Sequence, residues 1–593
     1  MCGFFGSFST NGKISNSIKN LVSLSHRGPD SKKRYNDEFL YGEFFRLNII
    51  GGKAANQPMI SYDKNYIMFF NGEIYNYIEL AKQYRISSQN GDSRVALELF
   101  AKKGVEAVKN FNGMFAIILY NKRAKSLHLV RDRLGTKPLY YTKKNDYFYF
   151  ASEIKALPIT KNVNLNIVKD YLQLGYYPYL NTFFKNIYNV PPSSIITIKK
   201  NTFKKIKYFN IKEEVLKKEK EGFDQEKFDQ LLKNAISIRQ RSDKKINFHL
   251  SGGIDSTALL IYTKDNWSSK YNLNSSSFSY YGYDQDEYKF ISRISKKIKV
   301  NNQKVVLFPK EVPDLAEKLQ YFQDEPYGGL ASVAEFKLNL EERKRGEVVS
   351  FEGTGGDEIL GGYNSHALLA LNDMINKNKS EDIIKNLNLY LGITNSKDRL
   401  YKTKKLIKSG FYANTDLSDF REYDIFKDID LKKNNWFKKI MLFDMIEAKI
   451  PRTLRFRDRT SAACSRELRF PFLDHDFLVY SLSSPIEFKF NFGLPKYPLR
   501  KIVKKYFKED FKFNKRSISS PQTNWIQGPL KEWTYDNLNS LETKFVIDKE
   551  YIFKAKKAVK SKINNSFFIW QLINLNLFFE NTKIKNFFIN DKR

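Results

Sequence analysis

A glycine-rich turn at residues 251–256, with the sequence SGGIDS, constrains the fold more than any other stretch of the chain. It follows an apolar-alternating run at 246–250 that predicts a short strand, and it precedes residues 257–262, which predict the first turns of a helix. Glycines let backbone N–H groups approach a ligand closely, and a helix N-terminus carries partial positive charge. The turn holds no lysine, so it is not the GxxxxGK[ST] phosphate loop. Alone, it is compatible with plain packing as well as with anion binding.

The pattern beyond this turn alternates strands with helices. Further strands are predicted at 276–281, 304–308 and 347–351, each followed by a helix-forming segment. Such alternation indicates a parallel sheet with covered faces, whose ligands lie at the carboxyl ends of the strands. A second glycine-rich segment, EGTGGDEILGGY at 352–363, directly follows the last of these strands. Both glycine-rich segments are therefore expected at one edge of the sheet.

The first 190 residues have a different pattern, with many short β-type runs and few long helices. These runs are separated by turn clusters and occupy residues 4–8, 39–50, 66–74, 113–120, 127–130 and 147–151. They predict a domain built from two packed sheets.

The bulk composition excludes several classes of protein. The 593 residues are enough for two to four domains, and the longest apolar runs, such as 114–120, are too short to span a bilayer. Two cysteines provide no disulfide framework and no cysteine-based zinc site, and the start of the chain does not resemble a signal peptide. The net charge of +35 comes from lysines spread along the whole chain, which indicates compositional bias. We therefore expect a cytoplasmic protein with no nucleic-acid partner and no membrane insertion.

Cys2 is the most informative single residue of the first domain. Removal of Met1 would leave a cysteine whose own α-amino group is free. Such a group has a pKa of about 7.7–8.0 and can act as a general base beside the nucleophilic thiol. An isolated cysteine at position two would be unremarkable by itself, so the segments around it decide the interpretation.

Those segments are MCG at 1–3, HRGPD at 26–30, FFNGEIYN at 69–76, RDRLGTKPLY at 131–140 and ASEIKAL at 151–157. In this order they resemble the N-terminal-nucleophile glutaminase of the asparagine synthetase family. The resemblance implies that Cys2 attacks the glutamine amide and that Asn71 and Gly72 stabilise the oxyanion. It also implies that Arg46 holds the glutamine α-carboxylate, while Glu73 and Asp92 receive its amino group.

The later motifs resemble the synthetase half of the same family. SGGIDS resembles the pyrophosphate loop of ATP-pyrophosphatase domains, and the second glycine-rich segment resembles SGxGxDExxxGGY. RFRDRTS at 455–461, SRELRFPFLD at 465–474 and KYPLR at 496–500 match the DRxSM, SxExRxPFLD and KxxLR patterns. By resemblance, Asp255 and Asp357 ligate Mg²⁺ and Lys496 stabilises charge on the departing pyrophosphate. The implied ATP-binding residues are Leu250, Ser251, Gly252, Gly253, Asp255, Ser256, Gly353, Thr354, Gly355, Asp357 and Lys496.

The resemblance also implies a fold and a domain organisation. The fold is an α+β Ntn hydrolase αββα sandwich followed by an α/β ATP-pyrophosphatase domain (adenine nucleotide alpha hydrolase-like) with a parallel sheet. The predicted boundaries are 2–192 for the glutaminase, 193–225 for a linker, 226–540 for the synthetase domain and 541–593 for a helical tail without assigned chemistry. The family further implies ATP and Mg²⁺ as cofactors, glutamine as a substrate and a possible homodimer.

The implied reaction is the amidation of a carboxylate through an acyl-adenylate. Aspartate is the default acceptor, which would place the enzyme in asparagine biosynthesis. Two departures touch the acceptor pocket: Thr354 stands where asparagine synthetases carry glutamate, and DEPYGG at 324–329 replaces a Thr-x-Arg segment. Relatives that amidate uronic acids of cell-surface polysaccharides have similar sequence motifs, including a stretch like residues 514–525. A hexuronic acid is therefore the alternative acceptor, and a nucleic-acid-modifying pyrophosphatase-loop enzyme is a remote one.

Overall fold

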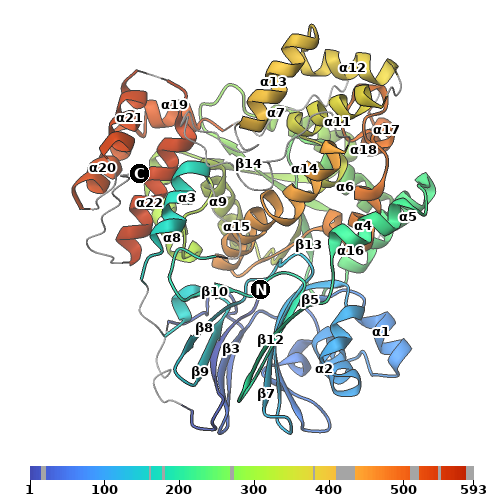
Figure 1. Cartoon of the computed structure of the whole chain (residues 1–593), viewed down its shortest axis with the longest axis vertical. Helices are drawn as coiled ribbons and strands as arrows, with labels where there is room; N and C mark the ends of the chain where they lie inside the picture. The colour runs from blue at the N-terminus through green and yellow to red at the C-terminus, as the bar shows by residue number, and fades with distance from the viewer. Residues whose placement is uncertain are drawn as a thin grey trace.

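Two antiparallel sheets stack face to face in the first part of the chain, below the helix-rich remainder (Figure 1). The computed structural model describes residues 1–14, 22–158, 162–175, 181–266, 273–377, 381–408, 435–507, 520–544, 549–561 and 563–582. The first sheet has the strand order β10 (Tyr188–Asn189), β8 (Tyr140–Lys144), β9 (Tyr147–Ala151), β1 (Gly3–Ser9), β3 (Leu40–Arg46) and β2 (Ser31–Asn36). The second has the order β12 (Thr202–Lys207), β11 (Ser194–Lys199), β7 (Ser126–Arg131), β6 (Gly113–Asn121), β5 (Tyr66–Ile74) and β4 (Met59–Ile60).

Alternating side chains of these strands build the core between the sheets. Phe4 and Phe8 of β1 point into it and meet Phe44 of β3 and Phe69 of β5, all fully buried. Phe5, which lies between them in sequence, belongs to a different buried cluster on the other face of the same sheet. Successive residues of a strand face opposite sides of its sheet, so β1 is buried on both faces.

Helices cover both outer faces of this sandwich. Helices α1 (Tyr77–Tyr84) and α2 (Gly91–Lys103) pack on the second sheet. The outer face of the first sheet shares one cluster of buried residues with α3 (Leu165–Leu174), α8 (Val312–Gln323) and α22 (Ser566–Thr582). The predicted αββα layering is therefore present, with one helical layer completed by later parts of the chain.

Strands β11 and β12 lie inside the segment 193–225 that was predicted to be a linker. β11 pairs with β7 and β12 pairs with β11, so the second sheet extends to Lys207. Helix α4 (Ile211–Glu219) follows before the next unit begins. The second sheet thus occupies about half of the predicted linker. Its last two strands were not predicted, because a short apolar run between proline- and lysine-rich stretches gives no clear strand pattern.

A five-stranded parallel sheet forms the centre of the second part, as predicted. Its strand order is β15 (Asn301–Leu307), β14 (Asn274–Tyr280), β13 (Ile246–His249), β16 (Val349–Phe351) and β17 (Glu467–Arg469). All four pairings are parallel. β17 was not predicted, since a three-residue strand with two charged side chains has no recognisable apolar pattern.

Helices pack on both faces of this sheet, where they share two separate clusters of buried residues with its strands. α5 (Gln225–Arg239) precedes β13, α6 (Ile254–Asn266) and α7 (Tyr288–Ile298) follow β13 and β14, and α8 and α9 (Leu330–Lys344) lie between β15 and β16. After β16 follow α10 (Gly356–Leu360), α11 (Asn364–Asn376), α12 (Glu381–Leu391), α13 (Ser396–Lys408), α14 (Trp436–Ile446), α15 (Lys449–Ala463), α16 (His475–Ser483), α17 (Ile486–Lys489) and α18 (Tyr497–Lys504). The last described elements are α19 (Gln522–Gln527), α20 (Lys531–Lys544), α21 (Lys549–Lys560) and α22.

Most described residues of the tail predicted at 541–593 lie in helices, and α22 is deeply buried. Gln571 of α22 donates from Nε2 to the carbonyl oxygen of Tyr171 on α3 at 2.9 Å. Asn574 donates from Nδ2 to the carbonyl oxygen of Tyr327 at 2.7 Å. α22 therefore joins segments from both parts of the chain. Among the described helices, none has the length and apolar character needed to cross a membrane.

Candidate active sites

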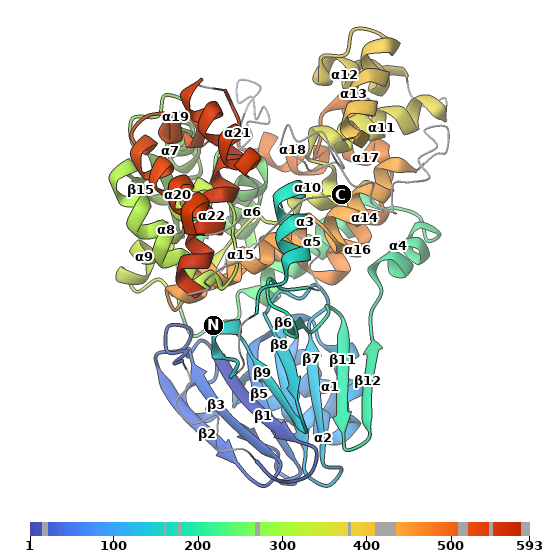
Figure 2. The same cartoon turned by 60° about the vertical axis from the view of Figure 1, so that its left-hand side comes forward.

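The first candidate site is a pocket at the start of β1. The N-terminus of the chain lies where the sandwich meets the helical part (Figure 2). Five of the predicted glutaminase residues line it together: Cys2, Arg46, Gly72, Glu73 and Asp92. The Cys2 thiol donates to the carbonyl oxygen of Leu47 at 3.7 Å, and burial raises the pKa of this thiol. Residues from four separate segments of the sequence thus converge around one sulfur atom.

Asn71 and Gly72 lie side by side in β5 as the predicted oxyanion donors. The side chain of Asn71 is fully buried, and neither its amide nitrogen nor its amide oxygen has a hydrogen-bond partner in the described structure. Gly72 has φ of 147°, and a Cβ at this position would collide with the carbonyl oxygen of Met114 on β6. A buried amide without a partner costs free energy unless a ligand completes it. The pair is therefore suited to receive a developing negative charge.

Arg46 is held rigidly at the end of β3. Its guanidinium donates to Asn56 Oδ1 at 3.1 Å, to Asn48 Oδ1 at 2.9 Å and to the carbonyl oxygen of Ile50 at 3.1 Å. These contacts use neutral acceptors, so the charge of Arg46 is not neutralised by any of them. A buried guanidinium in this state is well suited to bind a carboxylate.

Two acids of the pocket, Asp92 and Glu73, have raised pKa values. Burial raises the pKa of Asp92 to about 6, against the opposing effect of N–H groups from Ile74 and Ser93 that donate to its oxygens at 2.9 and 2.7 Å. Burial, together with nearby Glu467 and Asp92, raises the pKa of Glu73 well above its usual range. Both carboxylates would be stabilised by an ammonium group bound between them.

Among the lining residues of this pocket that were not predicted from the sequence, two carry ionisable groups. Glu467 of β17 lines it from the second part of the chain, and the buried Met1 lines it beside Cys2. Burial lowers the pKa of the Met1 amino group to about 5. Glu467 lies within the recognised SRELRFPFLD segment, but nothing in that segment indicated which side chain would reach the other domain. This contact depends on tertiary structure alone.

Arg27 of the HRGPD segment connects Cys2 with the second part of the chain. Its Nε donates to the carbonyl oxygen of Cys2, its Nη1 to Glu153 and its Nη2 to Asp458 of α15, each at 2.9 Å. All three side chains of this cluster are essentially inaccessible to solvent. The backbone of the candidate nucleophile is thus fixed to a helix of the second half.

The second candidate site begins at the turn between β13 and α6. Ser251 donates from its backbone N–H to Ser256 Oγ at 3.1 Å, which closes the turn. The backbone N–H of Gly252 donates to Glu287 Oε2 at 3.3 Å. The turn therefore donates a backbone N–H to a carboxylate oxygen, the kind of acceptor expected at a glycine-rich helix N-terminus.

Lys496 brings the two predicted metal ligands together. It precedes α18, which packs on α6, and its Nζ forms ion pairs with Asp255 and, at 2.7 Å, with Asp357. Burial opposes the charge, but the two carboxylates outweigh it and raise the pKa of Lys496 above its usual value. Two carboxylates aimed at one cation from neighbouring strand ends also fit Mg²⁺, which takes one or two carboxylates in addition to phosphate oxygens and water.

A cavity of about 370 Å³ lies beside this ion cluster, within the usual size range of small-molecule sites. The predicted residues that line it are Leu250, Ser251, Asp255, Ser256, Gly353, Thr354, Gly355 and Asp357. Gly252, Gly253 and Lys496 are not part of its lining, although Lys496 contacts two lining residues. Eight of the eleven residues predicted to bind ATP therefore lie around one cavity.

The contacts made by Thr354 and Asp324, which differ from the family pattern in sequence, were not predicted. Thr354 donates from Oγ1 to Glu352 Oε1 at 2.9 Å, and Arg457 of α15 donates to the same carboxylate from Nε at 3.0 Å. Asp324, from the other variant segment, instead accepts a hydrogen bond from the backbone N–H of Ile154 at 2.8 Å, in the first part of the chain. Residues 514–516 lie outside the described residues, whereas Gln522 accepts from the N–H of Leu330 at 2.8 Å.

Comparison with known protein families identifies the family to which this two-site chain belongs. The profile of the glutamine amidotransferase domain matches residues 1–209, and the profile of asparagine synthase matches residues 227–580. The chain belongs to the asparagine synthase family. The predicted family and fold class are thereby confirmed, and the asparagine synthase match extends into α22.

Several curated asparagine synthetases resemble this asparagine synthase family member along much of its length. Asparagine synthetase [glutamine-hydrolyzing] 1 of Bacillus subtilis is 27% identical, over 97% of this chain and 95% of its own. The putative asparagine synthetase 2 of Methanocaldococcus jannaschii is 29% identical over 62% of this chain and 76% of its own. The asparagine synthetase of Gallus gallus is 25% identical over 84% and 80%. Family membership supports glutamine-dependent amidation of the asparagine synthetase type, with use of ATP.

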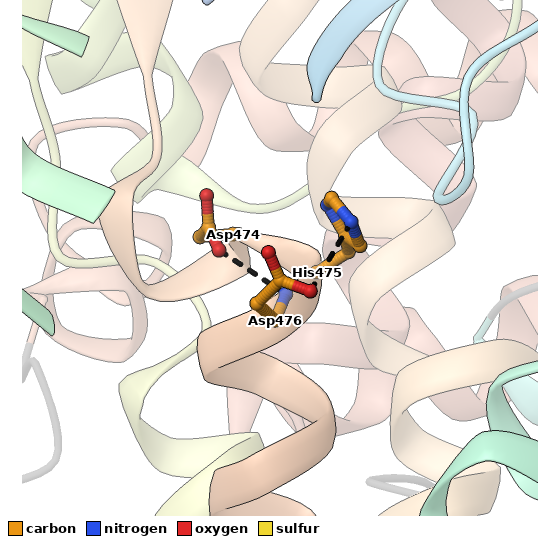
Figure 3. Close-up of side chains that lie close together, drawn as sticks. All are labelled: Asp474, His475 and Asp476. Carbon is orange, nitrogen blue, oxygen red and sulfur yellow. Dashed lines mark hydrogen bonds and ion pairs between the residues drawn. The ribbon is translucent and has the colours of Figure 1, made fainter. Parts of the chain in front are cut away.

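One further cluster of acidic and histidine side chains has the composition of a metal site. Asp474, His475 and Asp476, at the start of α16, have potential ligand atoms within 4.8 Å of one another (Figure 3). However, Asp474 caps the helix by accepting from the N–H groups of Asp476 and Phe477, and its other oxygen binds Arg239 at 2.7 Å. Burial lowers the pKa of His475 to about 3, with Arg133 adding to the effect. The geometry is explained by helix capping and an ion pair.

Proposed function

We propose that this protein uses ammonia from glutamine to amidate a carboxylate in an ATP-dependent reaction, with aspartate as the acceptor and asparagine as the product. The observation that carries the proposal is that one chain holds both a Cys2 pocket with an uncompensated Arg46 and a cavity with the Asp255–Lys496–Asp357 cluster. The names of the relatives along nearly the whole chain support the choice of acceptor.

In the first pocket, the Cys2 sulfur would attack the side-chain carbonyl carbon of glutamine. Asn71 and Gly72 would donate to the resulting oxyanion, while Arg46 binds the α-carboxylate and Asp92 binds the amino group. The carbon–nitrogen bond then breaks, ammonia leaves with the proton of the thiol, and water releases glutamate from the thioester. The α-amino group of Cys2, exposed after removal of Met1, would carry the proton between these steps.

In the second cavity, a carboxylate oxygen of the acceptor would attack the α-phosphorus of ATP. The bond to pyrophosphate breaks, and Lys496 would stabilise the negative charge that collects on the leaving group. When Mg²⁺ is bound, Asp255 and Asp357 would hold it, and it would supply charge neutralisation on the phosphates. Ammonia that has travelled through the protein interior then attacks the acyl-adenylate, which yields the amide and AMP.

A hexuronic acid is the second candidate acceptor. The observation that favours it is the hydroxyl of Thr354 at a position where asparagine synthetases carry a carboxylate, since this change removes one partner for an ammonium group. The chemistry of the two sites would be the same for either acceptor.

The test is pyrophosphate release from glutamine, ATP and Mg²⁺, measured with aspartate and separately with a UDP-linked hexuronic acid. We expect release with aspartate, and release only with the sugar acid would refute that acceptor. Asp255→Asn should abolish the release and leave glutamate formation intact. The matched control is Asp265→Asn, because Asp265 is exposed near the other end of the same helix α6. If neither acceptor releases pyrophosphate, the proposed reaction is wrong.

A further inference from the structure

Two buried glutamates line the second cavity, and each has one carboxylate oxygen without a hydrogen-bond partner among the described residues. Glu335 of α9 is 4% exposed and Glu352, directly after β16, is 8% exposed. Both line the cavity, and neither Glu335 Oε1 nor Glu352 Oε2 has a hydrogen-bond partner within the described ranges. An ionised carboxylate oxygen can only accept hydrogen bonds, and leaving it buried without a donor is costly. These two atoms therefore indicate a ligand that carries donors.

Arg457 of α15 joins the two glutamates. It forms an ion pair with Glu335 through Nη1 and with Glu352 through Nε, the latter at 3.0 Å. Its remaining nitrogen, Nη2, has no protein partner in the described part of the chain, and its side chain is 24% exposed at the cavity wall. Burial lowers the pKa of Arg457 to about 10, so its charge persists at neutral pH. The cluster thus offers two acceptor oxygens and one cationic donor.

The charge of this cluster selects the kind of ligand. Two carboxylates and one guanidinium sum to one net negative charge, and the nearby His249 is already held by Glu342 at 3.0 Å. An ammonium group would satisfy the two glutamate oxygens and neutralise the excess charge. A carboxylate beside that ammonium would satisfy Arg457. An ammonium and a carboxylate on one carbon form the head group of an α-amino acid.

We propose that Glu335, Glu352 and Arg457 bind the α-amino acid head group of the acceptor. The ammonium lies between Glu335 Oε1 and Glu352 Oε2, and the α-carboxylate contacts Arg457 Nη2. This inference rests on the proposed function, since it assigns the specificity of the same synthetase cavity. The inference also explains why a threonine can stand at position 354. The carboxylate that is absent there is supplied two residues earlier by Glu352, and the Thr354 hydroxyl orients it through a hydrogen bond of 2.9 Å.

The test compares Glu335→Gln and Glu352→Gln with the native enzyme in pyrophosphate release. Each substitution keeps the shape of the side chain and removes its charge, so KM for aspartate should rise by about 10- to 100-fold. The KM values for ATP and for glutamine should not change. The matched control is Glu341→Gln, because Glu341 lies on the same helix α9 but pairs with Lys344 near the surface.

Succinate provides a readout that a merely structural role would not change. It retains both carboxylates of aspartate but lacks the ammonium group, so the native enzyme should strongly prefer aspartate. In both glutamine variants this preference should shrink, because only aspartate loses an interaction. If either variant fails to fold, Thr354→Val, which removes only the orienting hydroxyl, should give a smaller shift in the same direction.

The outcomes separate the inference from the function on which it rests. If the native enzyme releases pyrophosphate with aspartate and the variants keep its KM, the head-group site is wrong and the proposed function stands. If the variants lose activity equally with aspartate and succinate, the cluster only supports the fold and the inference is overturned. If the native enzyme accepts the sugar acid and not aspartate, both the aspartate assignment and the head-group site fall.

Discussion

Replacement of Lys496 by methionine should stop adenylation while leaving the glutamine site active. Methionine approximates the length of the lysine stem but removes the ammonium that pairs with Asp255 and Asp357. Both carboxylates are mostly buried, with side-chain exposures of 16% and 29%. The variant therefore has two like charges facing each other where the native protein has a neutralising cation between them.

The geometry sets the size of the effect. At 2.7 Å, the distance from Lys496 Nζ to Asp357 Oδ1, and with an effective dielectric constant of about 20, one pair is worth about 6 kcal/mol before desolvation is subtracted. Loss of one partner of a buried pair destabilises a protein by about 3–5 kcal/mol, so a lower Tm is expected. Loss of a donor aimed at developing charge lowers kcat by about 10²–10³. We expect that range for pyrophosphate release.

The assay measures pyrophosphate and glutamate in the same reaction. Glutamate formation serves as the internal control for folding, because the Cys2 pocket does not contact Lys496. The matched control is Lys501→Met, an exposed lysine on the same helix α18. If Lys496→Met keeps nearly native pyrophosphate release while the protein remains folded, Lys496 does not stabilise the leaving group and the reasoning is refuted.

Three further predictions concern the glutamine pocket. Cys2→Ala should abolish glutamate formation but leave amidation with added ammonium, because only the nucleophile is lost. The kcat/KM for glutamine should rise with pH through about 6, since the buried Asp92 has a pKa of about 6 and must be ionised to bind an ammonium group; Asp92→Asn should raise KM and remove this inflection. Gly72→Ala should reduce glutamine use more than ammonium use, because the added Cβ collides with Met114 and displaces the oxyanion donors.

A different experimental result would contradict each of these three predictions. Glutamate formation by Cys2→Ala would show that another residue is the nucleophile. An unchanged pH profile in Asp92→Asn would assign the inflection to Glu73, whose pKa burial also raises. Equal losses with glutamine and ammonium in Gly72→Ala would mean that the substitution disturbs the whole fold rather than the pocket.

Much of both sites was predictable because short motifs fix local geometry. The turn at 251–256 required glycines between a strand and a helix, and the structure has β13, the turn and α6 in that order. Asn71 and Gly72 were recognisable because the segment FFNGEIYN at 69–76 resembles a family motif; the structure adds that the amide is buried and that Gly72 has a positive φ. Such features depend on residues that are close together in the sequence, so they can be recognised without knowledge of the fold.

The rest could not be predicted because it depends on distant segments. Glu335 and Arg457 belong to different helices, α9 and α15, and nothing in either helix indicates that they form an ion pair. Glu467 reaches the Cys2 pocket only because β17 extends the parallel sheet at its edge next to the first domain. Strand β12 is exposed and lysine-rich, so its pairing with β11 overrides a weak intrinsic preference.

Helix α22 has a consequence for how the protein acquires its structure during synthesis. Its apolar residues complete the buried cluster that also contains Phe5 of β1 and Tyr171 of α3. On a ribosome, the sandwich emerges before α22 (Ser566–Thr582), so the face of the sandwich that carries Phe5 stays incompletely covered until α22 has been made. Folding intermediates that lack α22 would therefore expose a wide aromatic surface, and a nascent chain at that stage is expected to depend on chaperones.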